Sequence, residues 1–512
     1  MNLHEGIQEM RITPRQAAGR LIMIRMPGQE LSAQQAAFLR DNHIRAVCLF
    51  RQNMANPQQL CRLTADLRAA MGPDALIAID QEGGAVVRAT WLPAPPAAMG
   101  LGAADDETLA EQVGAAVARG VKALGFNWNF APVLDLNNNL HNPVIAERSF
   151  GADPARVSAL AAAWMRGSLA EGVACCVKHA PGHGDTHVDS HRDLPTVDKP
   201  LAALQQLEFQ PFAALASDAP AMMTAHIVYP ALDAQHPATL SPAILQGLIR
   251  SSWNFDGVII TDGMDMHAIA GRYGAGQAAA QALLAGADMV MALGNTETQL
   301  ETLDALEHAI ASGAISMEEI QQRLGRLDRL AARYPVTQQP DGAYAREAAD
   351  HALMEEAWLR GLTALPHQGR LPQALPAGSA LQLLVRADVA HDGVSEKGLS
   401  ALELKRYLSP YYQVELSTFE DAESFDWAAW RASHPGFVLL ASTSRLRYPP
   451  CVREHWRPDL HVCLWNPFQA LDVAAPALLT YGFAAPGIRS ALRWLRGEVG
   501  ASGRNPCIDQ VA

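Results

Sequence analysis

Residues 173–195, VACCVKHAPGHGDTHVDSHRDLP, join a short apolar run to a polar loop rich in histidine and aspartate. The apolar part predicts a buried strand, and the Gly and Pro residues after it predict a loop. Similar runs recur through the first two-thirds of the chain, separated by stretches whose apolar residues have helical spacing. The eight runs are LIMIRM from Leu21, AVCLF from Ala46, LIAID from Leu76, FNWNFAPVLD from Phe126, VACCVKH from Val173, AMMTAHIVY from Ala221, GVIITD from Gly257 and ADMVMAL from Ala287.

This alternation of strands and helices predicts an α/β fold with a parallel sheet. Eight pairs favour a TIM-type (β/α)8 barrel over residues 1–340, although a doubly wound sheet of eight strands would give a similar pattern. The looser sequence VTQQPDGAY leads into a predicted linker, residues 341–362. Short apolar runs and a final helical stretch, IRSALRWLRG, predict a smaller α/β sandwich domain over residues 363–512.

Composition and charge narrow the class of protein. The 512 residues are 49% hydrophobic and 18% charged, which is typical of a folded globular chain. A formal net charge of -13 argues against a nucleic-acid partner, which would need clustered Lys and Arg. The N-terminus lacks the pattern of a secretory signal, and no apolar run approaches the roughly 20 residues that cross a bilayer. Seven cysteines, mostly in apolar segments, indicate reduced thiols. We therefore expect a cytoplasmic protein without a membrane partner.

In a barrel of this kind the chemistry lies at the C-terminal ends of the strands. The densest polar segment there, residues 178–195, carries four His and three Asp. It is interpreted in three ways: as a solvated loop, as a metal site or as a proton-transfer pair of Asp189 and His191. Because these two residues are two positions apart, the carboxylate could orient the imidazole and raise its basicity. The candidate metal ligands are His179, His183, His187, Asp189 and His191, but the first run, LIMIRM, adds none of the ligands that such a site would gather from several strands.

Asp262 ends the seventh run and is followed by Gly263, which allows a sharp turn. An Asp in this position often caps the next helix. A retaining glycosidase, however, needs one carboxylate that attacks the anomeric carbon and a separate proton donor. Asp262 together with the Asp189–His191 pair would supply both.

Further charged residues lie at the ends of other predicted strands. Carboxylate and guanidinium groups can form paired hydrogen bonds with neighbouring hydroxyl groups of a pyranose. Each of these charged residues alone could instead be half of an ordinary ion pair, and Asp80 could pair with Arg88. Their coincidence at one rim predicts a sugar-binding site. The candidates are Asp80, Arg88, Arg148, Lys178 and His179.

The motifs that carry these residues resemble glycoside hydrolase family 3, and within it the bacterial β-N-acetylglucosaminidase (β-hexosaminidase) branch. They are DQEGG with its following Arg, RSFGxDP, KHxPGHGDTxxDSHxxLP and TDGMDM, and they span about residues 80–340. The resemblance implies Asp262 as nucleophile, His191 as acid/base supported by Asp189, and the five rim residues as sugar-binding groups. In the related β-glucosidase branch a carboxylate from the second domain is the acid/base, whereas the His-containing loop marks the hexosaminidase branch.

Two positions depart from the family pattern. Ala85 stands where Arg is common, and Ala180 stands where an aromatic residue usually precedes PGHGD. Both changes remove bulk near the expected pocket, so we expect them to alter the space around the sugar. The C-terminal segments WNPFQALD and ALLTYGF resemble the sandwich domain that some members carry.

The expected function is that of a retaining exo-β-N-acetylglucosaminidase that needs no cofactor and no metal. By resemblance, its substrate is a GlcNAc-containing glycan or muropeptide fragment from cell-wall recycling. Transfer to phosphate instead of water stays open, as does the choice between a monomer and a homodimer. Two alternatives remain: a metal-dependent barrel hydrolase that uses the His-rich loop, and a catalytically silent sugar-binding protein.

Overall fold

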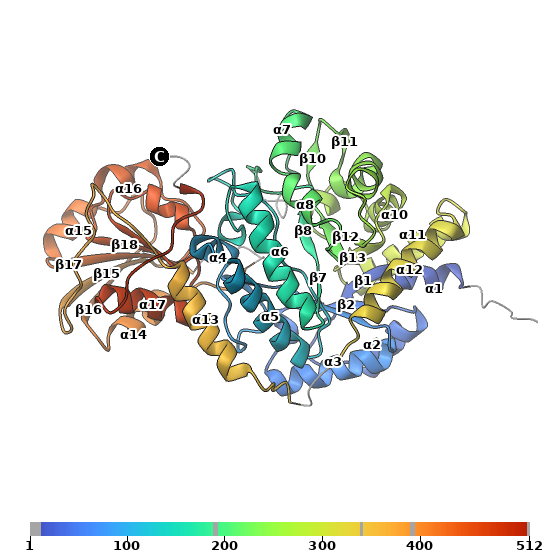
Figure 1. The fold of residues 1–512 in the computed structure, drawn as a ribbon, viewed down its shortest axis with the longest axis horizontal. Helices are drawn as coiled ribbons and strands as arrows, with labels where there is room; N and C mark the ends of the chain where they lie inside the picture. Colours follow the sequence, from blue (N-terminus) through green and yellow to red (C-terminus); the bar gives the residue numbers. More distant parts are fainter. Residues whose placement is uncertain (1–11, 188–192, 338–340, 390–394, 509–512) are drawn as a thin grey trace, which may run out of the picture.

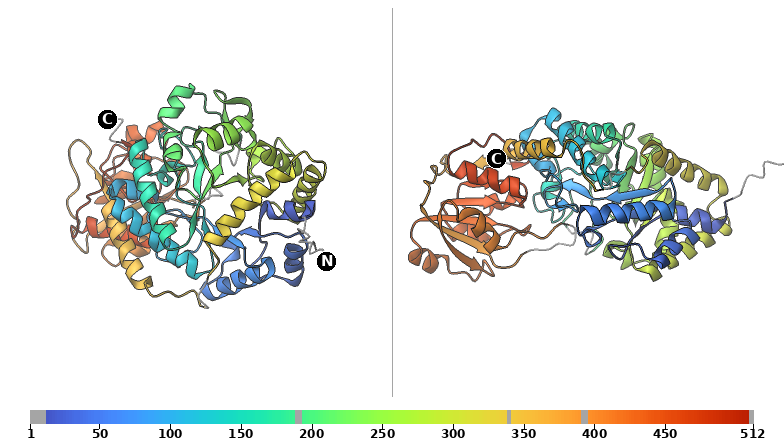
Figure 2. Two further views of the ribbon diagram at one scale, coloured as in Figure 1. Left: turned by 45° about the vertical axis from the view of Figure 1, so that its right-hand side comes forward. Right: turned by 90° about the horizontal axis from the view of Figure 1, so that it is seen from below.

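A computed structural model describes residues 12–187, 193–337, 341–389 and 395–508. Two parts lie side by side in Figures 1 and 2: a barrel wrapped in helices, and a smaller α/β unit coloured orange to red. No helix within the described ranges has the length and apolar character needed to span a bilayer.

The barrel consists of parallel strands that pair in chain order, and its last strand pairs with its first. The fifth strand is in two pieces separated by Cys176, of which one pairs with the preceding strand and the other with the following strand. The ring of eight strands is therefore closed, which confirms the barrel and excludes the open doubly wound sheet. The strands are β1 (Ile22–Arg25), β2 (Ala46–Cys48), β3 (Leu76–Ile79), β6 (Trp128–Asn129), β7 (Ala174–Cys175) with β8 (Val177–Ala180), β9 (Ala221–Thr224), β12 (Val258–Gly263) and β13 (Met289–Ala292).

Each predicted run contains one of these strands, because a parallel strand buried on both faces is apolar throughout. Helices surround the ring, and Asn56 and Asp153 cap two of them, because their side chains accept backbone N–H groups of α3 and α6. The covering helices are α1 (Pro14–Arg20), α2 (Ala33–Asp41), α3 (Pro57–Met71), α5 (Glu107–Ala123), α6 (Pro154–Ala170), α7 (Leu201–Gln206), α8 (Gln210–Leu215), the π-helix η4 (Ala243–Ser252), α10 (Ala275–Ala285), α11 (Thr296–Ala311) and α12 (Met317–Arg333).

Helices α5 and α6 approach each other closely because each presents a glycine to the other's backbone. A Cβ atom on Gly114 would lie 2.0 Å from the carbonyl oxygen of Trp164, and one on Gly167 would lie 2.0 Å from that of Glu111. A larger residue at either position would force the helices apart. Helix α6 of this pair also packs against β7 of the barrel.

The smaller domain is a six-stranded sheet with helices on both faces, in the order β14-β19-β18-β17-β15-β16. All neighbours are parallel except β14 and β19. The predicted α/β sandwich is thus confirmed. Its strands are β14 (Thr363–Leu365), β15 (Ala380–Arg386), β16 (Gln413–Phe419), β17 (Phe437–Ser442), β18 (Leu460–Cys463) and β19 (Ala477–Leu479), and its helices are α14 (Ala401–Leu408), α15 (Trp427–Ser433), α16 (Pro450–His455) and α17 (Ala485–Leu495).

The predicted linker, 341–362, contains a helix, α13 (Glu347–Gly361), which lies between the two parts in Figure 1. It is anchored on the barrel because the Asp350 carboxylate accepts two hydrogen bonds from Arg119. The Trp358 Nε1–H also donates to the Ala94 carbonyl oxygen at 2.9 Å. The segment is therefore mostly a packed helix. The domain limits 1–340 and 363–512 stay a prediction.

Candidate active site

A cavity of about 310 Å³ lies at the C-terminal ends of the barrel strands. This volume is within the roughly 300–1,000 Å³ of small-molecule sites. Its wall includes Cys48, Met223 and Met291, which lie in β2, β9 and β13. The structure brings together all the predicted site residues that it describes, since the cavity is lined by Asp80, Arg88, Arg148, Lys178, His179 and Asp262.

Asp262 lies in β12 and is partly exposed at the cavity. Its Oδ1 accepts a hydrogen bond from the Gly263 backbone N–H at 2.7 Å. The next helix, α9 (His267–Ala270), has Met266 at its N-cap position and no side-chain cap. The helix-capping interpretation of Asp262 is therefore wrong, and the carboxylate is placed to act on a ligand in the cavity.

Lys178 projects from β8 and bridges two carboxylates. Its Nζ lies 2.7 Å from Asp80 Oδ1 and 2.6 Å from Glu82 Oε1, and only 3% of its side chain is exposed. Burial acts to lower the pKa of Lys178, but the charges of Asp80 and Glu82 outweigh it and raise the pKa. The lysine is therefore a buried ammonium group that holds Asp80 beside the cavity.

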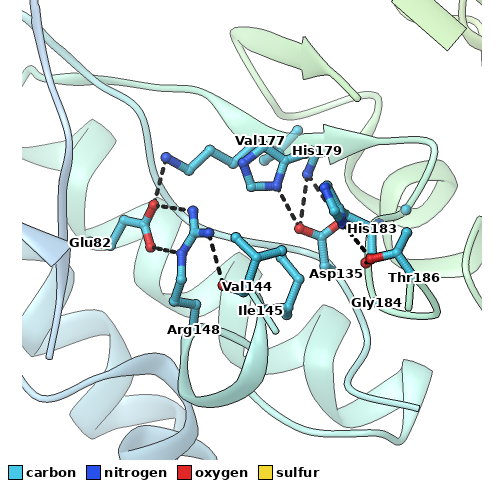
Figure 3. Close-up of polar contacts among 12 residues, drawn as sticks. Glu82, Asp135, Val144, Ile145, Arg148, Val177, His179, His183, Gly184 and Thr186 are labelled. Carbon is cyan, nitrogen blue, oxygen red and sulfur yellow. Dashed lines mark hydrogen bonds and ion pairs between the residues drawn. The ribbon is translucent and has the colours of Figure 1, made fainter. Parts of the chain in front are cut away.

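Arg148 and Glu82 form a second buried pair, shown in Figure 3. Arg148 donates from Nε and Nη2 to the two carboxylate oxygens of Glu82, at 2.9 and 2.8 Å. Burial would raise the pKa of Glu82, but Arg148 and Lys178 hold it well below its usual range. Glu82 was not predicted as a site residue, although it lies two positions after Asp80 in the DQEGG motif.

Asp135 organises the start of the His-rich loop (Figure 3). Its Oδ2 lies 2.7 Å from His179 Nδ1, and its Oδ1 accepts the His183 backbone N–H at 2.6 Å. Burial would raise the pKa of Asp135, but His179 outweighs burial and lowers it. Burial and the neighbouring His179 lower the pKa of His183 to about 4, so its imidazole is neutral. Asp135 was also not predicted, although it ends the fourth apolar run.

Arg88 connects the cavity to the second domain. Its Nη2 lies 3.8 Å from Asp80 Oδ2, so the pairing considered from the sequence exists but is longer than the Asp80–Lys178 contact. Its Nη1 donates at 3.1 Å to Oε1 of Glu396, which belongs to the second domain. No local sequence pattern indicated Glu396.

The predicted acid/base His191 and its partner Asp189 lie outside the described residues. The loop that leads to them begins at the cavity, which His183 lines, and Asn142 Nδ2 holds it by donating to the carbonyl oxygens of His183 and Gly184, both at 2.9 Å. The described part of the loop therefore starts beside the cavity wall. Among the described residues no three His, Cys, Asp or Glu side chains are grouped as metal ligands would be.

Ala85 and Ala180 are not among the residues that line the cavity, and their expected effect on the space around the sugar stays a prediction. Both are buried by neighbouring backbone. The Ala85 carbonyl oxygen accepts the Glu396 backbone N–H at 2.8 Å, and that of Ala180 accepts the Ala225 N–H at 2.7 Å. At position 85 the small side chain thus lies where the second domain contacts the barrel.

The chain has relatives among known proteins. A β-hexosaminidase of Chromobacterium violaceum is 38% identical over 355 residues, covering 66% of this chain and 96% of that protein. A family 3 β-N-acetylglucosaminidase structure from Paenibacillus sp. str. FPU-7 is 32% identical, covers 96% of this chain and 98% of that one, and has a TM-score of 0.85. NagZ from Neisseria gonorrhoeae, solved in complex with N-trifluoroacetyl-D-glucosamine, is 30% identical, covers 66% of this chain and 97% of that one, and has a TM-score of 0.57.

These relatives confirm the resemblance to the β-hexosaminidase branch that the motifs predicted. The model described as the glycosyl hydrolase family 3 N terminal domain matches residues 13–330, which include all eight strands of the barrel. Because this match covers well over half of the 512 residues, the chain belongs to glycosyl hydrolase family 3.

Proposed function

We propose that the protein is a retaining exo-β-N-acetylglucosaminidase that removes a terminal β-linked N-acetylhexosamine. The observation that carries the proposal is the position of Asp262, a carboxylate that faces a cavity surrounded by charged side chains from several barrel strands. The similarity to β-hexosaminidases, and to a NagZ solved with a glucosamine derivative, supports N-acetylglucosamine as the sugar.

The charged groups around the cavity match the hydroxyl groups of a pyranose. Asp80 is an acceptor held by Lys178, while Arg148 and His179 are fixed by Glu82 and Asp135. Because their partners hold these side chains in place before the sugar arrives, little conformational entropy is lost on binding. The sugar would then lie with its anomeric carbon toward Asp262.

The proposed reaction has two steps. A carboxylate oxygen of Asp262 forms a bond to C1 as the glycosidic C1–O bond breaks, and protonated His191 gives its proton to the leaving oxygen. Water then forms a bond to C1 while the bond to Asp262 breaks, and neutral His191 takes a proton from that water. Asp189 orients the imidazole in both steps.

Muropeptide-type fragments that carry a terminal N-acetylglucosamine are the proposed natural substrates, and the cytoplasm is the proposed compartment. All seven cysteines are free in the structure, and six of them are buried. Free thiols suit a reducing compartment.

Release of nitrophenol from the β-N-acetylglucosaminide and the β-glucoside, in EDTA, tests the activity. We expect strong preference for the N-acetylglucosaminide, and a decrease of roughly three orders of magnitude or more in Asp262→Asn. Activity that disappears in EDTA would favour the metal-dependent alternative. Sugar binding without any turnover would favour the silent sugar-binding protein.

The role of His191 has a separate test with a control on the same loop. His191→Ala should slow substrates with poor leaving groups by roughly a hundredfold or more, but slow the first step with nitrophenyl substrates much less, because nitrophenolate leaves without protonation. His187→Ala, which removes an exposed imidazole, should leave both rates near wild type. Equal losses in the two variants would contradict the acid/base assignment.

A further inference from the structure

Two charged side chains of the second domain contact the barrel loops that carry sugar-binding arginines. The first is Glu396, whose Oε1 accepts a hydrogen bond from Arg88 Nη1 at 3.1 Å and whose backbone N–H donates to the Ala85 carbonyl oxygen at 2.8 Å. The Arg88 and Glu396 side chains are 10% and 19% exposed, so the pair is mostly shielded from water. Arg88 therefore has one carboxylate from the barrel, Asp80, and one from the second domain.

The second is Arg445, which reaches the loop before Arg148. Its Nη1 donates to the Val144 carbonyl oxygen at 2.6 Å, and its Nη2 donates to Glu147 Oε1 at 2.8 Å. Trp465 Nε1 donates to the same Glu147 oxygen at 2.9 Å. The Arg445 and Glu147 side chains are 7% and 1% exposed, so this contact is buried.

The Arg445 contact is coupled to the sugar-binding group through a shared acceptor. The Val144 carbonyl oxygen also accepts a hydrogen bond from Arg148 Nη1 at 3.2 Å, and Val144 itself lines the cavity. Glu147 and Arg148 are neighbours in the short 3-10 helix η2 (Ala146–Arg148). Movement of Arg445 would thus shift the segment that positions the Arg148 guanidinium group.

We propose that the second domain completes the sugar-binding site, with Glu396 and Arg445 as positioning residues that fix Arg88 and Arg148. The inference rests on the proposed function, in which these two arginines bind the sugar. A shift of the arginines weakens sugar binding, while Asp262 and the proton donor are untouched. The expected consequence is a split between KM and kcat.

The test uses Glu396→Gln and Arg445→Lys in the full chain, assayed with nitrophenyl β-N-acetylglucosaminide and by calorimetric binding of free N-acetylglucosamine. For Glu396→Gln, loss of one charged hydrogen bond should raise KM and Kd about tenfold. Arg445→Lys should raise both in the same direction, with kcat within about twofold of wild type and with a lower Tm, because lysine cannot make both buried contacts. Glu396→Asp, which keeps the charge, should recover part of the affinity.

The matched control is Glu355→Gln. Glu355 is a partly exposed carboxylate of α13 that pairs with Arg489 of α17, and neither residue lines the cavity, so the control removes an ion pair outside the site. Its KM and Kd should equal those of wild type. Unchanged KM and Kd in both test variants would overturn the inference. Increases in KM and Kd no larger than those of Glu355→Gln would also overturn it.

The two proposals fail in distinguishable ways. If the wild-type protein binds N-acetylglucosamine without cleaving the substrate, the proposed hydrolysis fails and the Kd values alone decide the inference. A wild-type protein that neither cleaves nor binds the sugar overturns both. A drop in kcat that follows a lowered Tm, without a change in Kd, would assign Glu396 and Arg445 to stability alone.

Discussion

The ammonium group of Lys178 lies 2.6 Å from Oε1 of Glu82, inside a buried cluster of alternating charges. The same Glu82 oxygen accepts a hydrogen bond from Arg148, and Lys178 also contacts Asp80. The lysine thus stabilises two carboxylates at once, one at the cavity and one behind it. Loss of its charge would leave Glu82 with Arg148 alone, and Asp80 with only the more distant Arg88, as the remaining cation.

Lys178→Met should lower both stability and activity. Leaving a buried charge without its partner costs about 3–5 kcal/mol of unfolding free energy. The displaced Asp80 should lower kcat/KM by roughly a hundredfold. Denaturant unfolding and steady-state kinetics measure the two effects. In Arg15→Met, which removes a more exposed bridge to Asp304 and Glu307, stability should change by less than about 1 kcal/mol and kcat/KM should not change.

The buried imidazole of His183 should make stability depend on pH between about 4 and 6.5. Burial lowers its folded pKa from the ordinary 6.5 to about 4, so in this interval the unfolded chain takes up a proton that the folded protein does not. Stability is therefore lost as the pH falls through the interval, by about 3 kcal/mol for this group at pH 4. Asp135, whose folded pKa is lowered, adds its own loss only as the pH falls below its unfolded pKa near 3.8.

Denaturant unfolding at several pH values from 4 to 7 tests this prediction, with His183→Gln compared with the exposed His308→Gln. The slope of the unfolding free energy against pH should be shallower in His183→Gln than in wild type, and it should be the same as wild type in His308→Gln. Some slope should persist in both variants, because burial also lowers the pKa of His461 to about 3. An unchanged slope in His183→Gln would contradict the neutral imidazole.

The contact between α5 and α6 gives a prediction for stability alone. In Gly114→Ala the new Cβ would meet the Trp164 carbonyl oxygen at 2.0 Å, so the helices must separate and about 1–3 kcal/mol is lost. Gly325→Ala in α12 places its Cβ no closer than 3.8 Å to the Arg329 side chain, so higher helix propensity should raise stability by about 0.5–1 kcal/mol. Calorimetry should show a Tm below that of wild type for Gly114→Ala and above it for Gly325→Ala. A Gly114→Ala protein as stable as wild type would contradict the close approach of the helices.

The barrel could be predicted because its strands are buried on both faces and therefore appear as apolar runs. The break at Cys176, which divides the fifth strand between two neighbours, has no sequence signal because it depends on how the ring closes. The rim residues Asp80 and Asp262 could be found because a polar residue at the end of an apolar run lies at the C-terminal edge. Helix α13 was not predicted within the linker, because it packs against elements of both domains, α5 of the barrel and α17 of the second domain.

The missed residues act through partners that are distant in the sequence. Glu82 and Asp135 hold Arg148 and His179, and those pairings follow from the geometry of the barrel. Glu396 is separated from Arg88 by 308 positions, so only the docking of the second domain reveals it. The role of His191 stays a prediction, because it lies outside the described residues.

The central claim is that Asp262 forms a covalent bond with an N-acetylglucosamine residue. The most direct measurement is mass spectrometry of the protein after reaction with a fluorinated β-N-acetylglucosaminide that forms the glycosyl-enzyme quickly and releases it slowly. The account predicts a mass increase of one sugar residue, located by peptide mapping at Asp262 and absent in Asp262→Asn. Turnover with no trapped adduct, or an adduct on another residue, would contradict it.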